Sequence, residues 1–376
     1  MSIKVIRPGL MTTIQDLGRP GLQRFGVTPG GAMDTLAMRM ANMLAGNNER
    51  EAVLEATMAG PQLAFERDAL LAIAGGDLSP AIDGEPAPMN RPLYVRAGST
   101  LAFGQPRRGC RAYVAVFGGF DVPEAMGSRS TYLRGGLGGY EGRALQAGDE
   151  LAFRAPDDLG SRMPAHVKEE LSASEQPFLA AGWSAGELHP WERLMRAAGD
   201  TRHGAAHPGA RPIAADRPGQ ATSAIAGAST ASLAATAIIR VLPGTHEALF
   251  AEASLNAFYR EAFAVAPQSD RMGYRLSGTP LRLRQPAELL SEAVAFGTVQ
   301  VPPDGQPIVL MADRQTTGGY PRIAQIASVD LPLLAQLKPG DRVVFETITA
   351  GDAERLLLAR ERELAQLRIG IRFKFR

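Results

Sequence analysis

Five short segments are rich in glycine, aspartate and small hydroxyl residues, and four of them also carry arginine, a composition richer than turns between strands require. Glycine lets a backbone approach a ligand and expose its N–H groups, and arginine offers a planar fork to a carboxylate or phosphate. A turn needs glycine, asparagine or aspartate, but it does not need arginine together with glutamine and threonine. The segments are 7–19, 26–34, 118–139, 269–273 and 312–320.

Two of these segments are interpreted as loops that hold an anion, namely 127–131 (Gly-Ser-Arg-Ser-Thr) and 313–319 (Asp-Arg-Gln-Thr-Thr-Gly-Gly). For any one segment, the alternative is a tight turn whose arginine and aspartate pair at the surface. The repetition of the pattern across five segments favours binding. The residues predicted to bind substrate are Ser128, Arg129, Asp270, Arg271, Arg314, Gln315, Thr316 and Gly318.

Two carboxylates are the candidate catalytic residues. Asp313 follows the apolar run 308–311, so it is expected at a strand end, and Glu292 follows Ser291 after the apolar pair at 289–290. Either side chain has the chemistry of a general base or a magnesium ligand. The alternative is that each caps a turn or pairs with an arginine such as Arg314. Asp16 and Asp34 are expected to serve structure, Asp34 as the N-cap of a helix.

Scarce residue types exclude several kinds of chemistry. Lysine occurs only at positions 4, 168, 338 and 374, and none of these follows a glycine, so no phosphate-binding P-loop is present. No biotinyl-lysine motif occurs either, because the nearest string, Ala37-Met38-Arg39-Met40, has arginine where biotin would attach. His246 is the one histidine in well-patterned sequence, so a histidine-based catalytic triad is disfavoured. The single cysteine, Cys110, lies in a strand-like run and is expected in the core.

Composition places the chain among ordinary globular proteins. Its 376 residues are 45% hydrophobic, and 40 Lys and Arg oppose 39 Asp and Glu for a net charge of +1. A balance this close to neutral argues against a nucleic-acid or membrane-surface partner, since both need a basic footprint. One cysteine excludes a disulfide framework and a Cys-rich zinc site, and no metal site is predicted. With no signal peptide and no long apolar run, we expect a soluble cytoplasmic protein.

The elements that position these loops are mostly short strands. Apolar runs broken by glycine, proline and aspartate recur about every ten residues, a spacing typical of a barrel or sandwich. Helices are predicted over 34–44, with Leu36, Met40, Met43 and Leu44 on one face, and over 352–368, with Leu357, Leu364 and Leu367 on one face. Thr349 and Asp352 are predicted to cap the second helix. The predicted domains are 1–154, a linker rich in Ala, Gly, Ser and Pro over 155–237 that we expect to be disordered, 238–350, and a C-terminal helix and tail over 351–376.

Taken together and in order, the motifs resemble the allophanate hydrolase subunit 2 family, also called the biotin-dependent carboxyltransferase or Kip anti-inhibitor family. The motifs that carry this resemblance are 7–9 with 13–19, 30–34, 127–131, 269–276 and 312–321. Members include the C-subunit of the ATP-dependent 5-oxoprolinase. The chain departs from the family pattern in its long linker and in Gly244-Thr245-His246, where Gly-Pro-Gln is expected.

The resemblance implies a mainly β fold with two cyclophilin-like β-barrel domains and a few helices. It implies a Kip-inhibitor-like partner, the B-subunit, and, for 5-oxoprolinase, a further A-subunit. The implied activity opens 5-oxoproline to L-glutamate while ATP becomes ADP and phosphate, with ATP, and magnesium if required, bound by the complex. Arg129, Arg271 and Arg314 suit the carboxylate of the substrate or a developing phosphate. The alternatives are carboxyl transfer from carboxybiotin on another chain to urea or a related amide, and a regulatory module that sequesters a partner.

Overall fold

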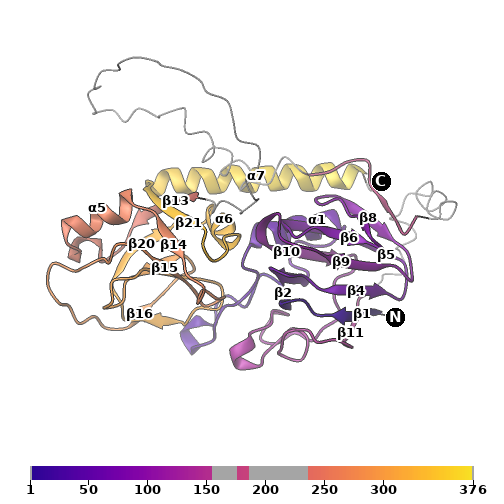
Figure 1. The fold of residues 1–376 in the computed structure, drawn as a ribbon, viewed down its shortest axis with the longest axis horizontal. Helices are drawn as coiled ribbons and strands as arrows, with labels where there is room; N and C mark the ends of the chain where they lie inside the picture. The colour runs from indigo at the N-terminus through magenta and orange to yellow at the C-terminus, as the bar shows by residue number, and fades with distance from the viewer. Residues whose placement is uncertain (1, 155–175, 186–235, 375–376) are drawn as a thin grey trace, which may run out of the picture.

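The computed structural model describes residues 2–154, 176–185 and 236–374. Within them, the chain forms two β domains side by side, with one long helix lying along both (Figure 1). The mainly β architecture predicted from the spacing of the apolar runs is therefore confirmed. No described helix is both long and apolar enough to cross a membrane.

The first domain consists of two antiparallel six-stranded sheets that enclose one core. In spatial order, the first sheet comprises β11 (Glu150–Ala152), β1 (Ser2–Arg7), β4 (Gln62–Phe65), β9 (Thr100–Phe103), β6 (Pro80–Ile82) and β7 (Glu85–Pro86). The second comprises β12 (Phe178–Ala180), β8 (Pro92–Val95), β5 (Ala69–Asp77), β10 (Arg108–Val116), β3 (Val53–Thr57) and β2 (Met11–Gln15). A short 3-10 helix, η2, spans Leu133–Gly135.

The central strands of the second sheet are buried on both faces, which explains their nearly continuous apolar sequence. In β10, Val114 and Val116 point into the core between the sheets, whereas Tyr113 and Ala115 pack on the other side against α1 (Thr35–Leu44). Asp34 caps α1 by accepting a hydrogen bond from the Ala37 backbone N–H at 2.9 Å. The predicted helix, its buried face and its cap are all confirmed.

The second domain is a closed barrel of seven strands. Around the barrel they are β13 (Thr236–Pro243), β20 (Arg322–Ile326), β17 (Thr298–Gln300), β18 (Ile308–Leu310), β15 (Gly273–Ser277), β14 (Phe263–Val265) and β21 (Arg342–Thr347). Parallel pairing of β13 with β21 closes it. Phe258 and Phe345 stack in its core with ring centroids 4.5 Å apart. The remaining elements are η1 (Gln23–Phe25), η4 (Glu247–Leu249), α5 (Glu252–Arg260), α6 (Leu331–Ala335), and the pair β16 (Glu292–Ala293) and β19 (Thr317–Gly318).

Helix α7 (Ala350–Lys374) leaves the barrel and runs back over the first domain, where it packs on α1 (Figure 1). Leu364 and Ile371 are buried against α1, and Arg39 donates two hydrogen bonds to Glu361, of 2.6 and 2.8 Å. The predicted cap is confirmed, because Asp352 N–H donates to Thr349 Oγ1. The predicted face was partly wrong. Leu357 is 38% exposed, whereas Leu364 is buried.

Twelve residues inside the predicted linker have a described structure, 176–185 and the first two residues of β13, 236–237. Residues 176–185 include β12, which pairs with β8, and Ala185, which is buried near α1. This short segment therefore belongs to the first domain. The rest of the predicted linker, 155–175 and 186–235, lies outside the described residues.

Packing of α7 on α1 yields the first prediction. Replacing the buried Leu364 with alanine should lower the free energy of unfolding by about 2–4 kcal/mol, because the helix loses its central apolar contact. Urea denaturation, monitored by circular dichroism, measures this change in the free energy of unfolding. The matched control, Leu358→Ala on the half-exposed side of α7, should cost less than about 1 kcal/mol. Equal losses from the two variants would show that α7 is not held by this contact.

Candidate functional site at the domain interface

A buried ionic network joins the two domains, and Arg271 is its centre. Arg271 lies in the turn before β15 of the barrel and is only 4% exposed. Its guanidinium binds the Asp313 carboxylate through two hydrogen bonds, Nε to Oδ2 at 2.8 Å and Nη2 to Oδ1 at 3.0 Å. It also donates from Nη1 to Glu55 of the first domain and from Nη2 to the Gly31 carbonyl oxygen at 2.6 Å. Arg271 therefore bridges charges and backbone from both domains.

The positive and negative charges of this network balance. Burial by itself lowers the pKa of Arg271, but attraction from Asp313 and Glu55 outweighs it and raises the pKa above its ordinary value. A second buried guanidinium, that of Arg111, has its Nε atom 3.9 Å from Glu55 Oε1. Two carboxylates thus face two guanidiniums. Because Arg271 occupies both oxygens of Asp313, that carboxylate positions Arg271.

Glu55 sits in strand β3, where its neighbours Leu54 and Ala56 point into the sheet core and Glu55 points toward the second domain. Its Oε2 atom accepts hydrogen bonds from the Met33 backbone N–H at 2.8 Å and from the Tyr113 hydroxyl at 2.9 Å. Burial raises the pKa of Tyr113 well above its usual value, and the charge of Glu55 adds to this, so the hydroxyl stays a donor. The carboxylate is thereby held toward Arg271.

Gln336, at the end of α6, forms a second contact between the domains. A register shift in the pairing of β10 with β5 leaves backbone groups near Cys110 and Arg111 outside the ladder. Gln336 Oε1 accepts from the N–H groups of both residues, at 3.1 and 3.0 Å, and its Nε2 donates to the Arg111 carbonyl oxygen and to Asp34 Oδ2. One amide of the barrel therefore completes hydrogen bonding at the bulge of the other domain.

Arg19 is the clearest candidate for binding a ligand in this region. It is 1% exposed, and its Nη2 and Nε atoms donate to the carbonyl oxygens of Ser130 and Ala125, but its Nη1 atom has no hydrogen-bond partner among the described residues. Burial lowers the pKa of Arg19, an effect that attraction from Asp16 and Asp313 partly offsets. A buried donor without a partner is costly, which is the condition that a bound anion would relieve.

Gly30 keeps space open beside this donor. Its φ of +64° is in the left-handed region, and a Cβ built there would lie 3.3 Å from Arg19 Nη1 and 3.7 Å from Asp313 Oδ1. A side chain at position 30 would therefore fill the gap between an arginine of the first domain and a carboxylate of the second. The loop that carries Gly30 brings them together.

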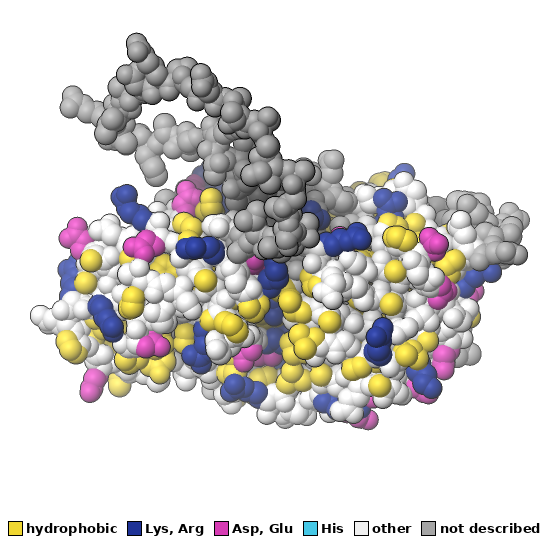
Figure 2. All heavy atoms as spheres, viewed as in Figure 1, with side chains coloured by type: hydrophobic (Ala, Val, Ile, Leu, Met, Phe, Trp, Pro, Cys, Tyr) yellow, Lys and Arg dark blue, Asp and Glu magenta, His cyan; other side chains and the backbone are white. Residues whose placement is uncertain are grey.

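Arg314 is the second arginine without a strong partner. It is 7% exposed, and its only described hydrogen bonds, to the carbonyl oxygens of Val294 and Met311, are long at 3.5 and 3.4 Å. Burial, partly offset by Asp313, lowers its pKa to about 10. Gln23 of the first domain donates 2.9 Å hydrogen bonds to the carbonyl oxygens of Val294 and Thr316, which places its loop beside Arg314. Figure 2 shows Lys and Arg side chains gathered along the seam between the domains on the visible face.

The structure brings together only part of the predicted site. Arg271, Arg314 and Asp313 are buried at the domain interface, and Thr316 contributes its carbonyl oxygen to the contact with Gln23. Gly318 lies in β19 against Gln300, where a Cβ would approach Gln300 Nε2 to 2.5 Å. The predicted catalytic role of Asp313 stays a prediction.

The other predicted residues lie outside the network. Glu292 is exposed and forms an ion pair with Arg322. Gln315 is also exposed. Asp270 stabilises a turn, because its side chain accepts hydrogen bonds from the N–H groups of Met272 and Gly273. Arg129 pairs with Glu124. The structure therefore places Glu292 and Arg129 in ion pairs and Asp270 in a local turn, and it leaves Gln315 exposed.

Ser128 belongs to a structural cluster around Asp16. That carboxylate accepts hydrogen bonds from the hydroxyls of Ser128 and Ser130 and from the backbone N–H groups of Gly18 and Arg129, at 2.5 to 2.7 Å. The cluster ties the loop at 125–131 to the loop that carries Arg19. The structural role expected of Asp16 is confirmed. No group of three or more potential metal-ligating side chains occurs in the described part of the chain.

Comparisons with known proteins agree on one family. The family model for the carboxyltransferase domain, subdomain A and B, matches residues 25–190 and 199–347. The chain is similar to the C-subunit of 5-oxoprolinase from Haemophilus influenzae, with 36% identity over 95% of this chain and 94% of the relative. It is also similar to the C-subunit of 5-oxoprolinase from Escherichia coli, with 35% identity over 97% of this chain and 97% of the relative.

A longer enzyme shares the same fold. In the crystal structure of the urea amidolyase of K. lactis, 20% of the chain corresponds to 97% of this one, with a TM-score of 0.76 and 28% identity. Urea amidolyase of Lachancea kluyveri is 29% identical over 98% of this chain and 18% of its own length. The arrangement described above is therefore used both as a separate chain and as part of a larger protein.

The Asp34 contact yields a prediction about pH. Burial raises the pKa of Asp34 from 3.8 to about 6, against hydrogen bonds from Ala37 and Gln336 that lower it. The folded protein therefore binds this proton more tightly than the unfolded chain, so stability falls as pH rises through the window from about 4 to 6, by an amount on the order of 2–3 kcal/mol.

Urea denaturation at several pH values measures this effect by comparison with Asp34→Asn, which keeps a capping oxygen but does not titrate. Subtracting the two curves removes the contribution of other carboxylates. The difference in the free energy of unfolding should change across pH 4–6 and level off above it. A difference independent of pH would show that Asp34 titrates as in the unfolded chain.

Proposed function

The chain belongs to the family of carboxyltransferase domains with subdomains A and B, and from this premise we propose that it is one component of an ATP-dependent 5-oxoprolinase complex. The complex would open 5-oxoproline to L-glutamate while ATP is hydrolysed to ADP and phosphate. The observation that supports this proposal is the share of each protein that the similarity covers. The similarity to the C-subunit of 5-oxoprolinase spans at least 94% of each chain, whereas the chain matches only 18% of a urea amidolyase.

The partners proposed for this activity are a Kip-inhibitor-like B-subunit and an A-subunit. ATP, with magnesium where needed, would be bound by the complex. A lactam carbonyl is a poor electrophile, and phosphorylation of its oxygen creates a leaving group before water attacks. The contribution proposed for this chain is to hold an anionic group between its two domains.

Chemistry at the interface supports this role. 5-Oxoproline carries a carboxylate at neutral pH, and charge-assisted hydrogen bonds from arginine to a carboxylate are strong and directional. Arg271 is already neutralised by Asp313 and Glu55. The Nη1 donor of Arg19 is buried without a hydrogen-bond partner among the described residues, and Arg314 forms only long hydrogen bonds to carbonyl oxygens. A substrate carboxylate or a developing phosphate would give both guanidiniums a charged acceptor.

The test of the activity is ATP-dependent release of glutamate from 5-oxoproline by the complex purified with this chain and reconstituted without it. We expect activity only when the chain is present. Full activity without it would refute the proposal. An intact complex that is inactive on 5-oxoproline would direct the assay to carboxybiotin and urea.

Substitution at the interface tests the site separately. Arg19→Gln and Arg314→Gln should each lower kcat/KM for 5-oxoproline by about 10- to 100-fold, the value of one hydrogen bond to a charged group. Arg134→Gln, at an exposed position of η2, is the matched control and should leave kcat/KM unchanged. Circular dichroism checks that each variant is folded. Unchanged kinetics in both interface variants would exclude these arginines from substrate binding.

Carboxyl transfer is the second candidate, favoured by the structural similarity to urea amidolyase over 97% of the chain. Any biotin would have to arrive on another protein, because Arg39 stands in the string nearest to a biotin-attachment motif. Arg39 is also committed to Glu49 and Glu361 through hydrogen bonds. Transfer of CO2 from free carboxybiotin to urea by the isolated chain would support this second function.

A further inference from the structure

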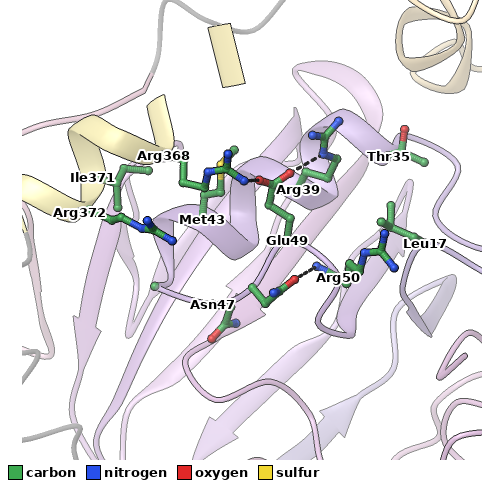
Figure 3. A pocket seen from close by; sticks show the side chains of 12 residues that line it. Leu17, Thr35, Arg39, Met43, Asn47, Glu49, Arg50, Arg368, Ile371 and Arg372 are labelled. Carbon is green, nitrogen blue, oxygen red and sulfur yellow. Dashed lines mark hydrogen bonds and ion pairs between the residues drawn. The ribbon is translucent and has the colours of Figure 1, made fainter. Parts of the chain in front are cut away.

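A cavity of about 1110 Å³ opens on the first domain, and none of its lining residues belongs to the network around Arg271. Its walls are α1, the loop at 45–50 that follows it, and the last turns of α7 (Figure 3). Met43 and Ile371 line it and are almost fully buried. The cavity therefore exists only because α7 returns to the first domain, and sequence reasoning did not predict it.

The lining of this cavity is strongly basic. Four arginines, Arg39, Arg50, Arg368 and Arg372, line it together with one carboxylate, that of Glu49. The cavity thus gathers an excess of three positive charges (four minus one) in a chain whose net charge is +1. So local an excess is unusual for a surface of mixed charges and favours an anionic occupant.

The arginines differ in how far their charge is neutralised. Arg39 and Arg368 both bind Glu49, at 2.7 and 3.1 Å, and Arg39 also binds Glu361. Arg50 and Arg372 are exposed and form no ion pair in the described part of the chain. Figure 3 shows these two on opposite sides of the cavity, with Glu49 and Arg368 between them. A ligand that engages both must carry negative charge at separated points.

The ligand chemistry follows from these observations. Guanidinium groups bind phosphate oxygens in pairs, and several of them around one space suit a chain of phosphates better than a single carboxylate. The volume lies slightly above the usual range for small-molecule sites, about 300–1,000 Å³, so the cavity has room for a ligand of nucleotide size. Met43 and Ile371 offer an apolar wall for a ring. We propose that this cavity binds a multiply phosphorylated small molecule of nucleotide size.

The experiment measures binding to the full chain by isothermal titration calorimetry, with ATP, AMP and inorganic tripolyphosphate as probes. We expect ATP and tripolyphosphate to bind at least tenfold more tightly than AMP. The affinity for ATP and the affinity for tripolyphosphate should both fall as the salt concentration is raised. Tighter binding of ATP than of tripolyphosphate would assign the ligand to nucleotides, and equal binding would assign it to phosphate chains in general. Either result supports the proposal.

Variants locate the site. The double variant Arg50→Gln with Arg372→Gln should weaken tripolyphosphate binding at least tenfold. The control double variant Arg134→Gln with Arg355→Gln removes the same charge at exposed positions outside the cavity and should bind as the unchanged chain does. Circular dichroism checks that both double variants are folded. We expect the Arg50 and Arg372 variant to fold because both side chains are exposed.

Several outcomes would overturn the proposal. These are no binding of either polyphosphate, equal weakening by the two double variants, or binding of an acidic peptide such as hexaglutamate with none of tripolyphosphate. The last would identify a docking site for a protein. The measurement uses no 5-oxoproline and no partner protein, so it stands whether or not the proposed 5-oxoprolinase activity is found.

Discussion

The architecture depends on one constraint, the neutralisation of Arg271 between two domains. A guanidinium stays charged at any physiological pH, and leaving such a group buried without a partner costs about 3–5 kcal/mol. Asp313 of the barrel satisfies two of its donors, but the barrel alone leaves the others unmet. Glu55 and the Gly31 carbonyl oxygen of the first domain each accept one more hydrogen bond. The barrel can therefore bury this arginine only when the first domain is docked in one orientation.

That orientation brings together loops that are far apart in the sequence. Gln23 reaches the carbonyl oxygens at Val294 and Thr316, and Gly30 lies between Arg19 and Asp313. Arg271 binds two carboxylates, whereas Arg19 keeps an Nη1 without a partner among the described residues and Arg314 forms only long hydrogen bonds to carbonyl oxygens. On our proposal, an anion bound between the domains would accept hydrogen bonds from these two arginines. A preformed site of this kind loses little entropy on binding, because its guanidiniums are already fixed by packing.

Local patterns in the sequence predicted local structure well. The spacing of Leu36, Met40 and Met43 identified α1, and Asp34 was recognised as its cap because capping depends on residues only three apart. Asp313, Arg271 and Arg314 were chosen as site residues from their loops; the structure buries all three at the domain interface, and their predicted roles stay predictions. Glu292, Asp270 and Gln315 were chosen by the same reasoning, yet all three are exposed. Composition alone does not distinguish the two situations.

Contacts across the interface could not be predicted, since they join positions hundreds of residues apart. Glu55 meets Arg271, and Gln336 fills a bulge at Cys110 and Arg111, with no periodicity that links them. One signal was available. Glu55 is a carboxylate within the otherwise uncharged segment 52–58, and a charge in such a strand requires a buried partner. The unpaired Nη1 of Arg19 becomes visible only once the surrounding carbonyl groups are placed.

The central claim is that the domain interface is an anion site completed by substrate. The most direct measurement is a crystal structure of the complex, or of this chain, grown with 5-oxoproline. The account predicts the substrate carboxylate within about 3 Å of Arg19 Nη1 or of the Arg314 guanidinium, with the Arg271 pairs to Asp313 and Glu55 intact. Substrate bound elsewhere, with both arginines unchanged, would contradict it.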